Sequence, residues 1–389
     1  MHFVFNDGAG MRLMAEGRAM SIRPKKRIGN GRRTFNPDAA TVVDLFCGVG
    51  GLSHGFHLEG MKVAAGIDLD RSCKFAFEVN NNAKFLCEDV SNIEPRYLRR
   101  LFGKGPTVLV GCAPCQPFSS YAAKFDNPDW KLLQDFASLI VKVRPDVVSM
   151  ENVPRLVDFQ KGRVFKAFVK KLRDAGYHVS YQIVYAPDYG VPQRRSRLVL
   201  LASRHGKIEL INATHSKAEH VTVRDAIGAL PRLKAGAANR RDPLHRCSGL
   251  SPLNLKRIRA ATAGGSWKDW RKNLITPCHK AKSGKTYVSV YGRMSWDAPS
   301  PTVTTQFFGF GNGRFGHPSQ DRAISLREGA ILQSFPPTYR FIDDDETVEM
   351  KRLGRLIGNA VPVLLGRAIA RSIKLHLRSV SAREARKQH

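Results

Sequence analysis

The chain has 389 residues, enough for two domains or for one large domain with an insertion. It carries 63 Lys and Arg against 33 Asp and Glu, and this net charge of +30 favours a polyanionic partner and disfavours a simple metabolic enzyme. Hydrophobic residues make up 42%, which excludes general disorder, and seven cysteines are too sparse for a disulfide scaffold.

The first 40 residues contain scattered Gly, Arg and Lys without a lasting periodicity, which predicts a basic mobile arm. Met11 or Met20 could also be the true start of the protein. The stretch shows no signal-peptide pattern, and the longest apolar runs of the chain are about ten residues, too short to span a membrane. A cytoplasmic protein is therefore expected.

Short apolar runs alternate with helical patterns over residues 41–203. The predicted strands are 41–46, 62–68, 107–110, 145–150 and 198–202, and the predicted helices are 52–59, 71–80 and 130–143. This alternation predicts an α/β fold with a doubly wound, mostly parallel sheet.

The alternation ends near residue 204, and the segment 204–297 contains 19 Lys and Arg but 6 Asp and Glu, interleaved with aromatic residues. We therefore expect a second, smaller and loop-rich domain at 204–322. Helical patterns return at 326–333 and 346–377, so residues 323–380 would complete the first domain, and 381–389 would form a basic tail.

A glycine-rich turn follows the first predicted strand at Gly48 and Gly50. Glycines in this position let a ligand approach the start of the next helix. Ser53 replaces the third glycine of a nicotinamide-binding pattern, which weakens that interpretation. Asp68 ends the second strand, where an acid can hold a ribose, and Asp89 could accept from an adenine amino group. The pattern predicts a nucleoside cofactor, although an ordinary glycine turn is the alternative.

Cys112 and Cys115 follow the strand at 107–110, at the sheet edge where α/β active sites gather. A zinc site would need a second cysteine pair, which the sequence lacks, and a redox pair does not fit well with Pro117. Two buried cysteines would not explain the prolines that flank Cys115. The remaining interpretation is a nucleophile on a rigid turn.

Glu151 ends the next predicted strand and would lie at the same sheet edge, as a candidate acid. Arg195 and Arg197 precede the strand at 198–202 and alternate, so they should share a face. They form either a basic edge strand or a clamp for an anion or a carbonyl group.

These segments, in this order, resemble the bacterial DNA cytosine-5 methyltransferases. The motifs are the loop 44–51, Pro114-Cys115-Gln116, Glu151-Asn152-Val153, the segment 193–197, the segment 300–305, the segment 327–336 and Gly358-Asn359-Ala360-Val361-Pro362. The resemblance spans residues 41–203 and 300–375.

The resemblance implies a reaction in which the Cys115 thiolate adds to C6 of cytosine, so that C5 becomes nucleophilic. Glu151 would hold and protonate N3, which requires a neutral carboxyl at that moment. Arg197 would bind the exocyclic O2, and Arg195 would hold the active-site loop or a phosphate. Cys112 would be a non-catalytic neighbour.

The implied methyl donor is S-adenosyl-L-methionine, and no metal is expected. The implied cofactor-binding residues are Phe46, Gly48, Gly50, Asp68, Leu69, Asp89, Pro114 and Asn359. Asp68 stands where the family more usually has Glu, a shorter acid that should still reach a ribose.

The implied substrate is a short specific sequence of double-stranded DNA, from which the target cytosine must be flipped out. Residues 116–129 would form a mobile loop over the flipped base, and the basic domain at 204–322 would recognise the target. The protein would act as a monomer in the bacterial cytoplasm, away from membranes, with a restriction endonuclease as a possible genetic partner.

Two other functions remain open from the sequence. An RNA cytosine-5 methyltransferase shares the Pro-Cys and Glu-Asn-Val signatures, but the long basic insertion favours duplex DNA. A non-catalytic DNA-binding protein is disfavoured because Cys115, Glu151, Arg195 and Arg197 are all intact. An amino-methylating enzyme would carry an Asp-Pro-Pro-Tyr or Asn-Pro-Pro-Tyr tetrapeptide, which the sequence lacks. The recognition sequence itself does not follow from these patterns.

Overall fold

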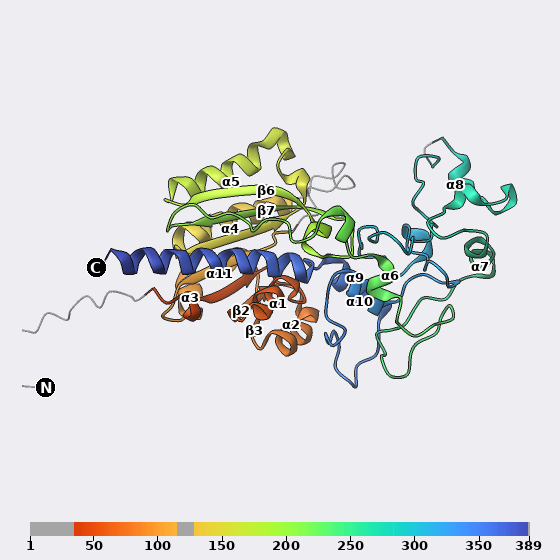
Figure 1. Cartoon of the computed structure of the whole chain (residues 1–389), viewed down its shortest axis with the longest axis horizontal. Helices are drawn as coiled ribbons and strands as arrows, with labels where there is room; N and C mark the ends of the chain where they lie inside the picture. The colour runs from red at the N-terminus through yellow and green to blue at the C-terminus, as the bar shows by residue number, and fades with distance from the viewer. Residues whose placement is uncertain (1–34, 115–127, 283, 388–389) are drawn as a thin grey trace, which may run out of the picture. The chain divides into compact units, whose positions relative to one another are not determined.

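The structure is a computed structural model that describes residues 35–114, 128–282 and 284–387. Most of the expected arm at 1–40 and most of the expected loop at 116–129 therefore lie outside the described residues, as does Cys115. The described part is built around one central sheet (Figure 1).

The sheet has seven strands in the order β3-β2-β1-β4-β5-β7-β6. They are β1 (Thr41–Leu45), β2 (Lys62–Asp68), β3 (Lys84–Cys87), β4 (Thr107–Gly111), β5 (Val147–Asn152), β6 (His178–Tyr185) and β7 (Ser196–Ser203). Only β7 runs against its neighbours, so the expected doubly wound, mostly parallel sheet is confirmed. The order of the strands reverses between β1 and β4, which is where open sheets of this kind bind ligands.

Helices cover both faces of the sheet because successive strand residues point to opposite sides. Val42 and Val108 belong to one apolar core, and Val43 and Leu109 belong to the other. The first face is covered by α1 (Gly51–Leu58), α2 (Lys74–Asn81) and α11 (Val363–Arg386). The second is covered by α3 (Pro95–Leu101), α4 (Lys131–Val143) and α5 (Arg163–Asp174). Uninterrupted apolar runs predicted most of these strands correctly, since both faces of the sheet are buried.

The returning segment forms three helices, α9 (Leu326–Leu332), α10 (Met350–Asn359) and α11. The helical pattern expected over 346–377 forms two helices, because the chain is extended at Ala360 and Pro362 between α10 and α11. Proline lacks the N–H that a helix interior needs and restricts the residue before it. Asn359 is the last residue of α10, directly before this break.

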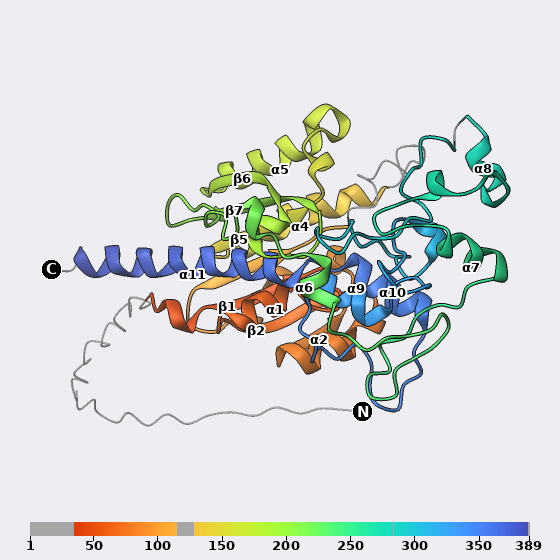
Figure 2. The ribbon, with the colours of Figure 1, turned by 45° about the vertical axis from the view of Figure 1, so that its right-hand side comes forward.

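Helix α11 lies along α1 (Figure 2). The stretch Met350–Arg386 is long and apolar enough to cross a membrane by length and composition. However, 78% of its most apolar window is buried inside the protein. Its apolar character therefore reflects packing against the sheet layer.

Residues 204–322 contain three short helices, α6 (Val223–Ile227), α7 (Pro252–Arg259) and α8 (Pro277–Lys280). Apart from residue 283, which is not described, the remainder of this segment consists of turns, short 3-10 helices and isolated β-bridges. A small core around Trp267, Trp270 and Phe310 gives the segment its own interior. We refer to residues 204–322 as the recognition segment, after the role that the sequence leads us to expect for it.

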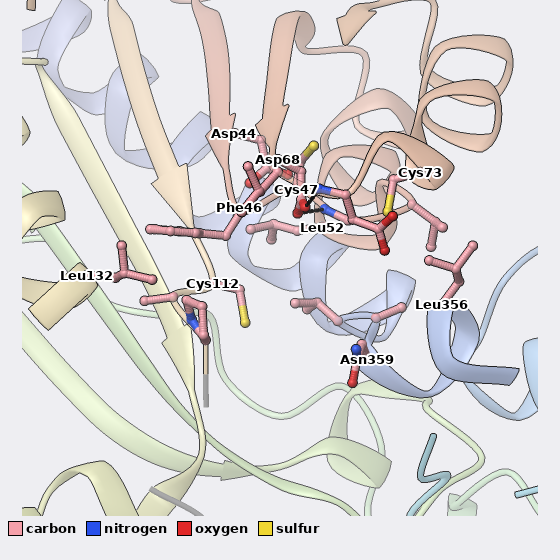
Figure 3. Close-up of a pocket in the computed structure, with 18 of the residues that line it drawn as sticks. Asp44, Phe46, Cys47, Leu52, Asp68, Cys73, Cys112, Leu132, Leu356 and Asn359 are labelled. Atoms are coloured by element: carbon pink, nitrogen blue, oxygen red, sulfur yellow. Dashed lines mark hydrogen bonds between the residues drawn. The ribbon is translucent and has the colours of Figure 1, made fainter. Parts of the chain in front are cut away.

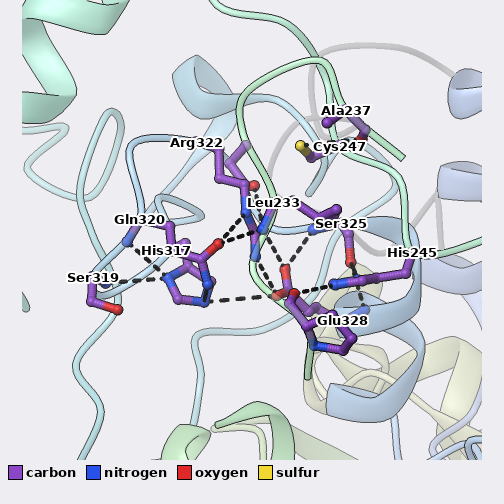
Figure 4. Close-up of polar contacts among 12 residues, drawn as sticks. Leu233, Ala237, His245, Cys247, His317, Ser319, Gln320, Arg322, Ser325 and Glu328 are labelled. Atoms are coloured by element: carbon purple, nitrogen blue, oxygen red, sulfur yellow. Dashed lines mark hydrogen bonds and ion pairs between the residues drawn. The ribbon is translucent and has the colours of Figure 1, made fainter. Parts of the chain in front are cut away.

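Two buried arginines organise the recognition segment where a sheet is lacking. The Arg293 guanidinium donates to the carbonyl groups of Ile258, Ala261, His317 and Gln320 at 2.7–3.1 Å. Arg322 is fully buried and makes two bonds of 2.7 Å to the Glu328 carboxylate on α9 (Figure 4). Paired, fully bonded charges of this kind tie the segment to the returning helices.

The turn after β1 has two glycines with left-handed backbone angles, Gly48 at φ +51° and Gly50 at φ +90°. A Cβ atom added to Gly48 would meet nothing within 4 Å. A Cβ atom added to Gly50 would collide with the Asn81 side chain and would lie 3.0 Å from the Phe77 ring. Gly50 is therefore required by packing as well as by conformation, whereas Gly48 faces open space.

The two glycines should respond differently to substitution. We expect Gly48→Ala to lower the free energy of unfolding by about 1 kcal/mol, the cost of a left-handed alanine. Gly50→Ala should lower it by roughly 2–4 kcal/mol, because the Asn81 side chain must also move. Denaturant unfolding of the two variants measures both values, and equal losses would contradict this packing of the turn.

Because of two buried histidines, we expect the free energy of unfolding to fall in acid. Burial lowers the pKa of His317 and of His376 to about 4 in each case. An unfolded histidine titrates near 6.5, so between these values the unfolded chain binds more protons and acidification favours unfolding. Each histidine should therefore lower the free energy of unfolding by up to roughly 3 kcal/mol as the pH falls from about 6.5 to about 4. Unfolding curves across this range test the expectation, and His376→Gln should show a shallower dependence than the unaltered protein.

Candidate active site

A cavity of about 880 Å³ lies beyond the carboxyl ends of β1 and β4, where the strand order reverses (Figure 3). Most residues expected to bind the cofactor or substrate line it: Phe46, Gly48, Asp68, Leu69, Asp89, Pro114, Arg195, Arg197 and Asn359. Gly50 is not among the lining residues, because it packs against α2. Glu151 lies just behind the wall, and Cys115 lies outside the described residues.

Asp68 organises the floor of the cavity through backbone hydrogen bonds. One carboxylate oxygen accepts from the Gly48 N–H at 2.8 Å, and the other accepts from the Asp70 N–H at 2.8 Å. Burial raises the pKa of Asp68. Each oxygen keeps a further lone pair, so the carboxyl can still accept from a ligand hydroxyl. Asp89 caps a short 3-10 helix by accepting from the Ser91 N–H at 2.9 Å.

The cavity is rich in acids although the protein as a whole is strongly basic. Its acidic lining residues are Asp44, Asp68, Asp70, Glu88, Asp89, Asp129 and Asp135, and its basic ones are Lys131, Arg195, Arg197 and Arg355. Asp44 is fully buried, and burial raises its pKa to about 7. Its Oδ2 accepts from the Ser53 hydroxyl at 2.7 Å, while its Oδ1 has no hydrogen-bond partner among the described residues. This lining fits a ligand that carries positive charge.

The returning segment closes the cavity at the break between α10 and α11. Asn359 lies at this break, and Arg355 lies one helical turn earlier on the same face. The Arg355 guanidinium pairs with the Asp70 carboxylate at 2.5 Å. Sequence reasoning missed Arg355, although its four-residue spacing from Asn359 was a usable signal. It also missed Asp44, which was read as part of the glycine-rich loop.

Two buried glutamines join the two halves of the site. The Gln193 amide donates to the Gln333 side-chain oxygen at 2.8 Å and to the Leu332 carbonyl at 3.0 Å. The Gln333 amide in turn donates to the Ile357 carbonyl at 2.9 Å. Gln193 also accepts from the Val303 N–H at 2.9 Å. These bonds fix the start of β7 to α9 and to the end of α10.

Arg195 lies within this joint and is 7% exposed. Its Nη1 donates to the Val303 carbonyl at 3.2 Å and to the Gln193 side-chain oxygen at 3.4 Å. The side chain therefore lines the cavity while it holds the segment 300–305 in place, and it shares the cavity with Arg197 as the alternation predicts.

The register of three strands brings Cys112, Glu151 and Arg197 together. Gly111 pairs with Met150 in the parallel β4–β5 ladder, so the next residues, Cys112 and Glu151, lie side by side on one face. Glu151 pairs with Val199 in the antiparallel β5–β7 ladder, and Arg197 is the diagonal neighbour on the same face.

The Glu151 carboxyl is held between these two neighbours and is 2% exposed. The Cys112 thiol donates to Oε2 at 2.9 Å, and Arg197 Nε lies 2.9 Å from Oε1 as an ion pair. The ion pair does not have hydrogen-bond geometry, so Oε1 accepts no hydrogen bond from the described residues. A buried carboxyl that is held in place in this way can recognise or protonate a ring nitrogen.

The recognition segment exposes a group of cations that the structure leaves without acidic partners among the described residues. They are Lys268, Arg271, Lys272, Lys280, Lys282 and Lys285. Acidic residues of the same segment pair instead with other arginines of the segment, as in the ion pairs Arg224–Asp297 and Arg259–Asp321. An exposed group of unpaired cations is suited to phosphate binding.

A family model described as C-5 cytosine-specific DNA methylase matches residues 40–375. The chain is 50% identical to the Type II methylase M.HgiDII of Herpetosiphon aurantiacus, over 88% of this chain and 97% of the relative. It is 31% identical to the Type II methyltransferase M1.HphI of Haemophilus parahaemolyticus, over 86% of each chain.

Solved structures agree on the fold. A protein encoded within an Escherichia coli prophage superposes with a TM-score of 0.68 at 22% identity, covering 87% of this chain and 99% of the other. The Entamoeba histolytica methyltransferase EhMeth gives a TM-score of 0.60 at 15% identity, covering 87% and 98%. The family model matches residues 40–375 of the chain, and the chain covers 97% of a relative to which it is 50% identical. The chain therefore belongs to the C-5 cytosine-specific DNA methylases and is a DNA cytosine-5 methyltransferase.

Proposed function

We propose that the protein transfers a methyl group from S-adenosyl-L-methionine to C5 of a flipped-out cytosine in a short specific sequence of double-stranded DNA, through a covalent adduct between Cys115 and C6. One observation carries this proposal. A single cavity combines an acid-rich half at β1 and β2 with a second half at the end of β4 and the start of β7, where Pro114 and Arg195 line the wall and Arg197 pairs with the Glu151 carboxyl.

The acid-rich half of the cavity supports the assignment of a positively charged nucleoside as the methyl donor. S-adenosyl-L-methionine carries a sulfonium and an ammonium group, and when bound it supplies an electrophilic methyl group. Asp68 would accept from the ribose hydroxyls and Asp89 from the adenine amino group, with Phe46 and Leu69 against the adenine ring. Gly48 and Asn359 would face the methionine portion, and Gly50 would shape the turn that supports Gly48.

Cys115 would act as the nucleophile because it directly follows, in the sequence, Pro114, which lines the cavity. Its thiolate would form a bond to C6 of the base, and the electron pair of the C5–C6 double bond would then become available at C5. After C5 is methylated, transfer of the C5 proton to water would re-form the C5–C6 double bond, and the sulfur would leave C6 with its electron pair, which restores the aromatic ring and the thiolate.

Glu151 would stabilise the charge that develops on the base. In the protonated form its carboxyl would donate to N3, and Oε1 is the oxygen without a hydrogen bond among the described residues. Arg197 would bind the exocyclic O2 while it keeps the carboxyl in place. Arg195 would hold the segment 300–305 against the site.

The substrate base lies inside the stack of a duplex, so the enzyme would flip it out at a cost of a few kcal/mol. The exposed cations of the recognition segment would bind phosphates and position the duplex. We propose that the enzyme works as a monomer on chromosomal DNA in a bacterial cytoplasm. A restriction endonuclease of the same sequence specificity would be its genetic partner, in keeping with the Type II names of its relatives.

The nucleophile assignment is tested with labelled methyl transfer from S-adenosyl-L-methionine to unmethylated genomic DNA and, in parallel, to bulk tRNA. The unaltered enzyme should label DNA at one short motif, and Cys115→Ala should abolish transfer while binding duplex DNA normally. Cys87→Ala, at an exposed cysteine outside the cavity, is the control and should keep full activity. An active Cys115→Ala variant, or label confined to tRNA, would overturn the proposal.

The basic recognition segment predicts a steep dependence of DNA binding on salt. If six or more phosphates are neutralised, affinity should fall by about a thousandfold or more between about 50 and 200 mM salt, because condensed counterions are released. Replacing Lys280 and Lys282 by Ala should reduce the slope of log affinity against log salt. A flat titration would contradict the assignment of this surface to DNA.

A further inference from the structure

The sequence places two cysteines three residues apart at the end of β4, and the proposed reaction uses only Cys115. Cys112 is half-buried and lines the same cavity, beside the Glu151 carboxyl. Its position therefore calls for an explanation of its own.

The Cys112 thiol has a defined partner. Its Sγ donates to Glu151 Oε2 at 2.9 Å, opposite the Arg197 ion pair on Oε1. Both neighbours come from strands that flank β5, so the carboxyl is fixed from the two sides in the plane of the sheet. With two lateral contacts, the side chain has little freedom to rotate away from the cavity.

A second contact ties the same two strand ends together. The Asn152 side chain, fully buried, donates to the Ala113 carbonyl at 3.0 Å. The Cys112 backbone N–H also donates to the Leu45 carbonyl of β1 at 3.3 Å. Residues 112 and 113 are therefore anchored to β1 and β5, so the thiol projects from a fixed backbone.

We propose that Cys112 is a positioning residue for methyl transfer, whose thiol holds the Glu151 carboxyl in the orientation that meets the cytosine ring. The proposal rests on the proposed role of Glu151 at N3. A thiol suits this task because it can donate one hydrogen bond to a carboxyl oxygen and so fix its orientation. If the thiol were removed, Oε2 would lose this hydrogen bond, and the ion pair between Arg197 and Oε1 would be left to orient the carboxyl.

The test is a double-mutant cycle on the single-turnover rate of methyl transfer, measured on the full chain with saturating DNA and S-adenosyl-L-methionine. Cys112→Ala should lower this rate about tenfold, as expected for the loss of one hydrogen bond to a reacting group. The KM for the methyl donor and the Kd for DNA should change less than about twofold, since the thiol acts on the chemical step.

Two further variants separate positioning from simple packing. Cys112→Ser keeps a donor at the same place and should recover most of the lost rate, whereas a packing role would leave it as slow as Cys112→Ala. In a Glu151→Gln background, Cys112→Ala should have almost no further effect, because the group through which it acts has been altered. Unfolding curves should confirm that each variant is folded.

The outcomes also separate this inference from the proposed function. If Cys112→Ala keeps the full rate, or if its effect simply adds to that of Glu151→Gln, the positioning role is wrong while the assignment of Cys115 stands. If Cys115→Ala remains active, the proposed function itself fails. A large rise in KM for the methyl donor in Cys112→Ala with an unchanged single-turnover rate would assign Cys112 to the cofactor wall and overturn the proposal.

Discussion

The geometry of the candidate active site depends on two buried glutamines, Gln193 and Gln333, which are hydrogen-bonded to each other. They connect the start of β7 to α9 and α10, across more than 100 residues of intervening chain. Buried amides without partners are costly, so this arrangement is stable only when both segments are correctly docked. The same contacts place Arg195 and Asn359 at the cavity. A bond remote from the reacting atoms thus makes two distant stretches of sequence act as one site.

The recognition segment is organised by a different principle from the sheet. Its described residues have no strands of their own, and Arg293 and Arg322 satisfy the loop carbonyls and a buried carboxylate that a sheet would otherwise order. Its anchoring charges are therefore buried, while the lysines and arginines that have no acidic partner among the described residues are exposed. This separation lets the surface that would meet DNA carry a strong positive charge without disturbing the contacts that hold the segment to α9.

Local patterns predicted much of this molecule. Apolar runs marked the buried strands, and the polar residues that follow β1, β2, β4 and β5 were correctly expected at one sheet edge, where Asp68 and Glu151 now lie. Long-range pairings could not be predicted in this way. The break at Pro362 interrupts an otherwise helical pattern, Gly50 turned out to pack against α2, and the Arg355–Asp70 pair joins residues far apart in the chain. The Gly50 packing and the Arg355–Asp70 pair have no short-range signature that specifies the partner, whereas Pro362 is itself a local signal that a helix is interrupted.

The antiparallel direction of β7 brings the beginning of that strand to the same edge as the ends of β4 and β5. The grouping of Cys112, Glu151 and Arg197 is therefore a matter of strand alignment and not of loop conformation. A single inserted or deleted residue in β5 or β7 would turn one partner to the opposite face of the sheet. Residues 204–299, by contrast, lie outside every strand pairing of the sheet, so a change of length in that segment leaves intact the register on which this grouping depends.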